Sequence, residues 1–375
     1  MNDSLILQVI ENIHINVSKN FSNSINIGVL NGISGYSIFY EYYNKYLTDQ
    51  PNEYQSKHIL NICIDRINNN YNKATYCDGI CGFIWAINFL KENKLRYFNL
   101  NINSLYKYIK EWTLIAIASG NYDFLHGSTG TIYYLVNKLK INSNSLSLFQ
   151  NYINALENKY CEIYNFRNQK LAERSYLGLA HGVACYMKIL LTISKIPQLK
   201  EQCYNLLYKN YNFLIKIYNF SENKKSLFPS WLSYNTDINK EYSGLSWCLG
   251  DPGIGITLLN ISSDINDINM RNIAVNILKH SSKRLSEEQS LLKHPCLCHG
   301  FFGAYKIFSR AYTLTNEKEF LNAKKHWLSR GLEYLNNNKL PDDLSILNGQ
   351  SGIGLALIDV YTDTDHNWGE CLLIS

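Results

Sequence analysis

Cysteine and histidine recur at fixed positions before a repeated Gly-x-x-Gly motif. Cys248 and Cys298 each lie two residues before the first glycine of such a pair, and His299 lies between Cys298 and Gly300. Two thiolates and one imidazole suit zinc in tetrahedral geometry, and a site with three protein ligands leaves a fourth position for water or substrate. The three residues therefore predict an open zinc centre, although their spacing is not that of a zinc finger or ribbon.

Further polar residues share the phase of the glycine motif. His126 directly precedes the first glycine of a pair, as His299 does, and His181 precedes Gly182 of the fourth repeat, where the motif is the variant Gly182-Val-Ala-Cys185. Because equal phase in a repeat places residues at the same end of the fold, His181 is expected to face the same cavity as the zinc ligands. Asp123, four residues before such a glycine, is a candidate acid–base partner or a helix cap. Cys77 has the phase of the two zinc cysteines and is a candidate fourth ligand, although a ring would place it away from them.

The glycine motif divides the chain into seven repeats. The first glycines are separated by 47, 48, 55, 68, 50 and 49 residues. After the motif, apolar residues recur at three- and four-residue steps, which predicts amphipathic helix. A helix of about 14 residues spans about 21 Å, so two helices and two loops fill each period. The first glycines are Gly32, Gly79, Gly127, Gly182, Gly250, Gly300 and Gly349.

The repeats favour a closed ring over an open stack. Open stacks need polar terminal repeats, whereas the first and last motifs here, Asn31-Gly-Ile-Ser-Gly35 and Asn348-Gly-Gln-Ser-Gly352, are nearly identical. We therefore predict an all-α fold, an α/α toroid of seven helical hairpins with an inner ring of helices inside an outer ring, formed by a single domain over residues 1–375. The Asn-, Ser- and Lys-rich insertions near residues 140–175 and 220–245 are expected to be surface loops.

Composition excludes several classes of protein. The 375 residues are 46% hydrophobic and 18% charged, which is too apolar for a disordered chain. The net charge is +5 without a cluster of basic residues, so no nucleic-acid partner is expected. The sequence contains no recognisable signal peptide or membrane span, and the ten cysteines are expected to be reduced thiols in the cytoplasm.

Together these motifs resemble the lanthionine synthetase C-like cyclases, which close thioether rings in lanthipeptide precursors. The resemblance covers essentially the whole chain. It implies zinc held by Cys248, Cys298 and His299, and acid–base chemistry by His181 and Asp123. It rests on Ser246-Trp-Cys-Leu-Gly-Asp-Pro-Gly253, Cys298-His-Gly300, Leu179-Ala-His-Gly182, Tyr122-Asp123 and the segment Trp368 to Ser375.

The resemblance also implies a reaction and its participants. The chain is expected to be a lanthionine synthetase that activates cysteine thiols of a dehydrated precursor peptide for Michael-type addition to dehydroalanine or dehydrobutyrine. Zinc would be the cofactor, the leader-bearing peptide the substrate, and a separate dehydratase and an exporter the partners. The expected location is the cytoplasm, peripheral to the membrane through a biosynthetic complex. Some relatives carry an arginine four residues before the first zinc cysteine, where this chain has Gly244.

Three alternatives stay open from the sequence. A relative that adds glutathione to dehydroamino acids would use the same zinc and histidine. A non-catalytic peptide-binding ring would need a fourth protein ligand to close a structural zinc site. A glycoside hydrolase on a related helical barrel would need two carboxylates about 5–9.5 Å apart, and the in-phase positions offer few carboxylates.

Overall fold

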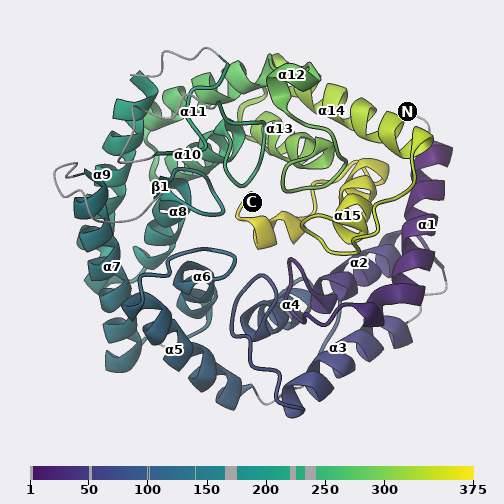
Figure 1. Ribbon diagram of the computed structural model, residues 1–375, viewed down its shortest axis with the longest axis horizontal. Coiled ribbons are helices and arrows are strands. Elements are labelled where there is room, and N and C mark those ends of the chain that lie inside the picture. Colours follow the sequence, from purple (N-terminus) through teal and green to yellow (C-terminus); the bar gives the residue numbers. More distant parts are fainter. Residues whose placement is uncertain are drawn as a thin grey trace.

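The computed structural model describes residues 3–49, 53–98, 100, 102–139, 141–164, 175–219, 225–232 and 242–375. Within these ranges the helices form two concentric rings (Figure 1). The inner ring consists of α2 (Ile33–Tyr46), α4 (Ile80–Glu92), α6 (Ser128–Lys138), α8 (Val183–Ile193), α10 (Asp251–Ile265), α13 (Phe301–Thr315) and α15 (Gln350–Tyr361). The outer ring consists of α1 (Asp3–Asn20), α3 (Glu53–Asn68), α5 (Asn103–Ala118), α7 (Ser143–Tyr164), α9 (Lys200–Asn219), α11 (Ile268–Ser282) and α14 (Lys318–Asn337).

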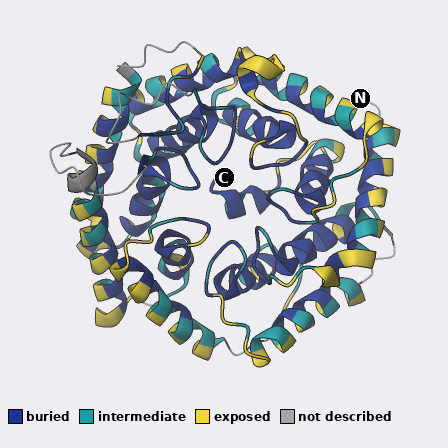
Figure 2. Ribbon diagram, in the orientation of Figure 1, coloured by how far each residue is buried: buried dark blue, intermediate teal, exposed yellow. Residues whose placement is uncertain are grey.

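The inner ring is closed by contacts between neighbouring helices. Each inner helix packs against the next, and α15 packs against α2. The outer helix α1 packs on α15, so the first helix of the chain covers the last inner helix. Inner helices are buried on nearly all sides, whereas outer helices bury one face (Figure 2). The predicted α/α toroid of helical hairpins is therefore confirmed.

The glycine pairs are required by the turn into each inner helix. The first glycine is the N-cap of the helix in every repeat. The second glycine lies where the helix packs on its own preceding loop. A Cβ on Gly303, for example, would lie 1.9 Å from the carbonyl oxygen of Leu297. No side chain fits that space, so the close approach needs glycine.

The loops before the inner helices are joined by a closed circle of backbone hydrogen bonds, which we call the belt. It surrounds one end of the ring, called the mouth below. The residues two positions before each first glycine are therefore neighbours in space, as the repeat phase predicts. The N–H to O pairs of the belt are Leu30 to Cys77 (3.0 Å), Cys77 to Leu125 (2.9 Å), Phe124 to Ala180 (3.2 Å), Ala180 to Cys248 (3.1 Å), Trp247 to Cys298 (2.9 Å), Cys298 to Leu347 (3.0 Å) and Leu347 to Leu30 (3.0 Å).

The C-terminal segment lies in the centre of the ring (Figure 1). It includes the 3-10 helix η3 (Asn367–Leu372) and is buried through Ile374. The indole N–H of Trp247 donates to the carbonyl of Leu372 at 2.8 Å, and the amide of Asn260 donates to the carbonyl of Ile374 at 3.0 Å. This segment therefore packs directly beneath the loop that carries Cys248.

The remaining elements are short. They are η1 (Phe21–Asn23), η2 (Pro197–Leu199), α12 (Glu287–Ser290) and the antiparallel strands β1 (Ser175–Tyr176) and β2 (Trp231–Leu232). No helix in the described part of the chain is both long and apolar enough to cross a membrane.

One sequence expectation is wrong. Most of the segment expected to be a surface loop near residues 140–175 is the outer helix α7. Its buried side chains Leu148, Phe149, Tyr152, Ile153 and Leu156 follow a helical period that the surrounding Asn and Ser residues obscure. Residues 165–174, 220–224 and 233–241 of the two insertions lie outside the described residues.

Candidate functional site

Asp251, the first residue of α10, fixes the loop that carries Cys248. Its buried carboxylate accepts hydrogen bonds from the backbone N–H groups of Leu227 at 2.8 Å and Phe228 at 3.0 Å, and pairs with Arg284 at 3.4 Å. Burial raises the pKa of Asp251, against the opposing charge of Arg284. These contacts hold residues 225–232 against the start of α10. They therefore restrain the loop before α10, which carries Cys248.

Cys248 and Cys298 lie side by side on neighbouring loops of the belt. The Cys298 thiol donates a hydrogen bond to Cys248, which lowers the pKa of Cys248 to about 7 despite burial and raises the pKa of Cys298. The nearby His181 also lowers the pKa of Cys248. One sulfur of the pair therefore loses its proton near neutral pH, as a metal ligand must.

His299 directly follows Cys298 and is exposed. Burial of its ring and the nearby His294 lower the pKa of His299, so its imidazole is neutral at pH 7, which is the form that binds metals. Cys248, Cys298 and His299 do not form a group whose ligand atoms all lie within 4.8 Å of one another. Among the described residues, such a group is formed by Cys77, Asp78 and His126 instead. The structure thus brings the two thiols together. His299 follows Cys298 in sequence, but its ring nitrogens do not lie close enough to both sulfurs to form a compact three-ligand group.

His181 and Asp123 are in direct contact at the mouth. His181 Nδ1 lies 2.5 Å from Asp123 Oδ2, and both side chains are about three-quarters buried, at 28% and 24% exposure. Burial works to lower the pKa of His181, but the hydrogen bond and charge of Asp123 outweigh it and raise the pKa above 6.5. The contact occupies Nδ1 and leaves Nε2 as the nitrogen that can exchange a proton with a substrate.

Asp123 holds this position because it also caps a turn. Its Oδ1 accepts the backbone N–H of His126 at 2.8 Å. At the equivalent position in other repeats, the hydroxyls of Ser246 and Ser345 accept the N–H three residues later, at 3.4 Å and 3.2 Å. A hydroxyl completes the turn, but only a carboxylate completes it with a second oxygen to spare, and that oxygen binds His181. The carboxylate of Asp123 thus caps a turn and contacts His181 at the same time.

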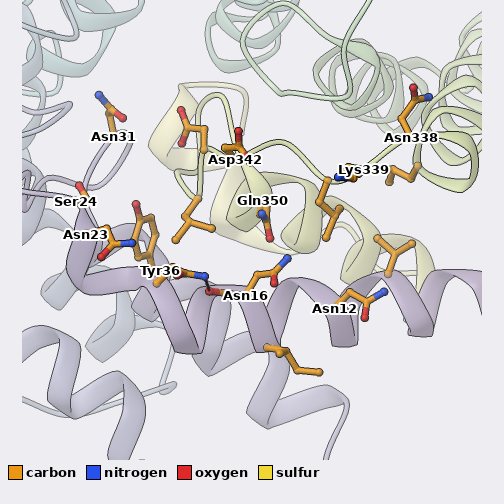
Figure 3. A pocket seen from close by; sticks show the side chains of 17 residues that line it. Asn12, Asn16, Asn23, Ser24, Asn31, Tyr36, Asn338, Lys339, Asp342 and Gln350 are labelled. Atoms are coloured by element: carbon orange, nitrogen blue, oxygen red, sulfur yellow. Dashed lines mark hydrogen bonds between the residues drawn. The ribbon is translucent and has the colours of Figure 1, made fainter.

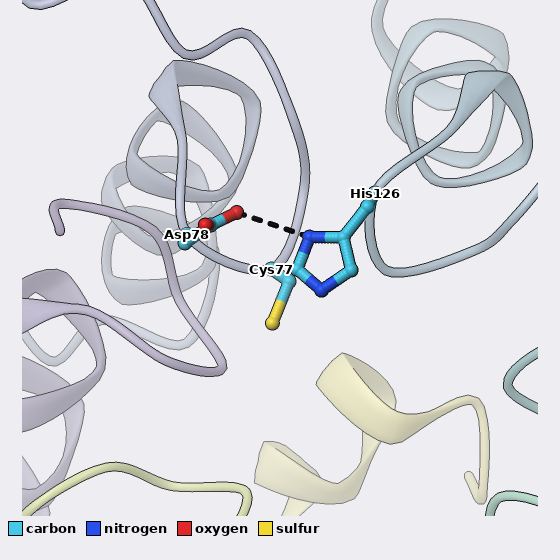
Figure 4. Close-up of side chains that lie close together, drawn as sticks. All are labelled: Cys77, Asp78 and His126. Carbon is cyan, nitrogen blue, oxygen red and sulfur yellow. Dashed lines mark ion pairs between the residues drawn. The ribbon is translucent and has the colours of Figure 1, made fainter.

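A second group of metal-ligand residues lies at the mouth, on the loops of the second and third repeats. Cys77, Asp78 and His126 offer ligand atoms within 4.8 Å of one another (Figure 4). His126 Nδ1 lies 3.3 Å from Asp78 Oδ1, which also accepts a hydrogen bond from the Thr75 hydroxyl at 2.6 Å. This group offers one sulfur, whereas Cys248 and Cys298 together offer two.

The electrostatics of this second group are those of an ion pair beside a neutral thiol. The hydrogen bond to Asp78 raises the pKa of His126. Burial opposes ionisation of Asp78, but hydrogen bonds from His126 and Thr75 hold its pKa well below the usual range. Burial raises the pKa of the Cys77 thiol. Without a metal ion, Cys77 is therefore protonated at neutral pH.

Sequence reasoning did not predict Asp78, and it considered Cys77 only as a fourth ligand for the other site. A signal was present, because Asp78 and His126 each directly precede the first glycine of consecutive repeats. Because consecutive repeats are neighbours in a ring, the side chains of Asp78 and His126 are expected to be in contact. Comparing unlike residues at one phase in consecutive repeats would identify this pair from the sequence.

Gly244 leaves the arginine found in some relatives without a counterpart at that position. The neighbouring carbonyl of Ser243 accepts a hydrogen bond from Arg284. The Arg284 guanidinium, however, is 5% exposed and pairs with Asp251. Its contacts with Ser243 and Asp251 anchor the loop that precedes Cys248.

Two comparisons with known proteins bear on the fold and the family of this chain. A solved structure, "Nisin cyclase", superposes with a TM-score of 0.74 over 97% of this chain and 96% of that chain, at 18% sequence identity. This similarity shows that the two share a fold. Residues 4–373 match the family described as "Lanthionine synthetase C-like protein". Since the match spans nearly the whole sequence, the chain belongs to the lanthionine synthetase C-like family.

Proposed function

We propose that this chain is a zinc-dependent lanthipeptide cyclase that works as a single cyclase domain. Its substrate would be a leader-bearing precursor peptide that a separate dehydratase has dehydrated and that an exporter later removes from the cytoplasm. Family membership and the fold shared with a protein named as a cyclase support the reaction class. The observation that carries the proposal is the paired thiols of Cys248 and Cys298 at the same mouth as the His181–Asp123 contact.

The residues at the mouth fit a zinc ion. A hydrogen bond from the Cys298 thiol lowers the pKa of Cys248 to about 7, and the imidazole of His299, whose pKa is lowered by burial, follows in sequence. Sulfur and nitrogen donors are those that zinc prefers. Two thiolates would neutralise the charge of the dication. When bound, zinc lowers the pKa of a substrate thiol and keeps its sulfur ionised.

His181 would handle the protons of the addition. The thiol of a peptide cysteine loses its proton, and its sulfur forms a bond to the β-carbon of a dehydroamino acid. The electron pair of the carbon–carbon double bond moves to give an enolate, and the α-carbon then takes up a proton. His181 Nε2 is the group in this account that accepts or returns that proton, because Asp123 holds Nδ1 and stabilises the imidazolium. The product is a thioether with no change in mass.

The test is an assay of free thiols on a synthetic peptide that contains one cysteine and one dehydroalanine a few residues apart. The zinc-loaded protein should consume the thiol without changing the peptide mass. We expect His181→Asn to slow this by about 10²–10⁴-fold, the range for loss of a general acid–base group. His126→Asn, which alters the other Asp–His pair of the mouth, should have a much smaller effect.

Two outcomes would reject the cyclase proposal. One is thiol loss no faster than in buffer without protein. The other is a peptide that gains the mass of glutathione when glutathione is present and loses no thiol internally. That second result would assign the chain to the glutathione-adding alternative.

A further inference from the structure

A groove crosses the seam between the first and last repeats, where α1 packs on α15. Its volume is about 870 Å³, within the usual range of about 300–1,000 Å³ for ligand sites. One wall is α1, and the other is the loop from Asn338 to Leu344 with the start of α15 (Figure 3). Amide side chains are the most frequent polar groups in the lining, on both walls.

The amides on α1 are spaced to follow an extended peptide. Asn12, Asn16 and Asn20 line the groove at four-residue intervals along the helix. Four helical residues rise about 6.0 Å, and two residues of an extended chain rise about 6.6–6.8 Å. Each primary amide can donate to a peptide carbonyl and accept from a peptide N–H. The side-chain amides of Asn12 and Asn16 make no hydrogen bond to any residue that the structure describes.

The opposite wall presents a buried acceptor without a donor. Gln350 is 4% exposed, and its Nε2 donates to the carbonyl of Pro341 at 2.7 Å. Its Oε1 is buried and has no hydrogen-bond partner among the described residues. A buried acceptor left unpaired costs about 1–3 kcal/mol, and a peptide N–H in the groove would supply the missing donor. Figure 3 places Gln350 across the groove from Asn16.

The groove leads to the mouth. It is lined at one end by Asn31, whose backbone N–H donates to the Cys77 carbonyl of the belt at 2.9 Å. Apolar contacts are available along the way from Ile15, which is 44% exposed, and from Leu340. The charged side chains at the rim have both signs, Lys339 against Asp342 and Asp343. The chemistry therefore suits a largely uncharged peptide whose backbone is recognised.

We propose that this groove binds an extended segment of about four to six residues of the substrate peptide, apart from its reacting residues, and so positions the peptide at the mouth. Asn12, Asn16 and Gln350 bind the peptide backbone, and Ile15 packs against an apolar side chain. This inference rests on the proposed function, because it takes the ligand to be part of the same peptide.

The test measures binding and needs no turnover. Linear dodecapeptides displayed on phage are selected on the full-length wild-type protein, and fluorescein-labelled copies are then titrated by anisotropy. Ile15→Arg and Asn12→Arg should each weaken binding by at least about tenfold, equivalent to about 1.4 kcal/mol. The matched control is Ile115→Arg on α5, where Ile115 is 67% exposed far from the groove lining, and it should bind like the wild type.

The inference is overturned if no peptide is selected, or if the selected peptides bind the Ile15→Arg and Asn12→Arg variants as tightly as the wild type. Melting temperatures near that of the wild type show that both variants are folded. If the groove binds peptides but the protein consumes no thiol, the proposed cyclase function is wrong and the assignment of the groove as a peptide-binding site is retained. If the protein cyclises peptides and Ile15→Arg leaves KM and kcat unchanged, the groove fails and the proposed function stands.

Discussion

His181 Nδ1 lies 2.5 Å from Asp123 Oδ2, while the other oxygen of the same carboxylate accepts the backbone N–H of His126 at 2.8 Å. One carboxylate therefore shapes a turn and sets the basicity of a histidine on the neighbouring repeat. Asn at position 123 would keep an oxygen for the turn and lose the negative charge. This allows the two roles to be separated by a single substitution.

Asp123→Asn should lower the pKa of His181 in the metal-free protein. The hydrogen bond and charge of Asp123 raise this pKa above 6.5, whereas burial lowers it, so removing the charge should take it below 6.5. Titration of the imidazole by NMR measures the change directly. An unchanged or higher pKa for His181 in the variant would show that Asp123 does not control it.

The same contact predicts how stability depends on pH. Because the folded-state pKa of His181 is raised, its stabilising contribution is complete below about pH 6.5, the unfolded value, and is lost as the pH rises through the raised pKa. Asp123→Asn should therefore destabilise the protein more at about pH 6 than at about pH 9. Urea unfolding at the two pH values checks the sign.

Cys248 should be the most reactive thiol of the metal-free protein. Cys248 and Cys298 are each 8% exposed, more than any other described cysteine, and the hydrogen bond from Cys298 lowers the pKa of Cys248 to about 7. Cys298→Ala should slow alkylation of Cys248 by iodoacetamide at neutral pH, because alanine removes the hydrogen bond that lowers the pKa of Cys248. Mass spectrometry of the labelled peptides gives the rates, with Cys296→Ala as the control. Equal rates in the two variants would show that the hydrogen bond from Cys298 does not control the pKa of Cys248.

Much of the mouth could be predicted from sequence because the repeat phase becomes proximity when the ring closes. Cys248 and Cys298 lie in consecutive repeats at one phase, and the belt joins their loops through the Trp247 N–H. Phase does not say toward which neighbour a side chain turns. Side-chain rotation decides that Asp78 pairs with His126, and it decides that His299 stays apart from the sulfurs of Cys248 and Cys298. The period of a repeat does not specify side-chain rotation.

The C-terminal segment shows another limit of the sequence pattern. Its contacts with Trp247 and Asn260 join residues more than a hundred positions apart, and no repeat signal marks them. Similarly, the sequence favours a loop where the structure has α7, because the polar residues between its buried positions resemble a loop in composition. Both cases are decided by tertiary packing, which local propensity does not capture.

Gly178→Ala should disturb the loop of Cys248. A Cβ at position 178 would lie 2.1 Å from the Cys248 carbonyl oxygen, which is backbone and cannot rotate away. We expect a loss of about 1–3 kcal/mol in the free energy of unfolding, typical of overpacking, together with weaker zinc binding. Gly28→Ala is the matched control, since its Cβ would lie 2.4 Å from the Cys77 carbonyl oxygen in the equivalent contact. If both variants are destabilised to a similar extent and only Gly178→Ala loses zinc, the metal is bound by the group that contains Cys248. If only Gly28→Ala loses zinc, the metal is bound by the group that contains Cys77.

Arg284→Met should destabilise the protein by about 3–5 kcal/mol at pH 7, because it leaves the buried carboxylate of Asp251 without its cation. Burial raises the pKa of Asp251, so part of the loss should be recovered at lower pH, where the carboxylate is neutral. Asp251→Asn combined with Arg284→Met should be more stable than Arg284→Met alone. Chemical unfolding followed by fluorescence measures all three. A double variant less stable than the single one would mean that the ion pair is not the main role of Arg284.

The most direct measurement is zinc-edge X-ray absorption of the protein purified without chelators, compared with its Cys248→Ser and Cys77→Ser variants. We expect two sulfur ligands, one nitrogen and one exchangeable light ligand, with loss of a sulfur in Cys248→Ser and no change in Cys77→Ser. A single sulfur that disappears in Cys77→Ser, or four protein ligands that substrate thiols cannot displace, would contradict an open thiol-activating centre at Cys248, Cys298 and His299.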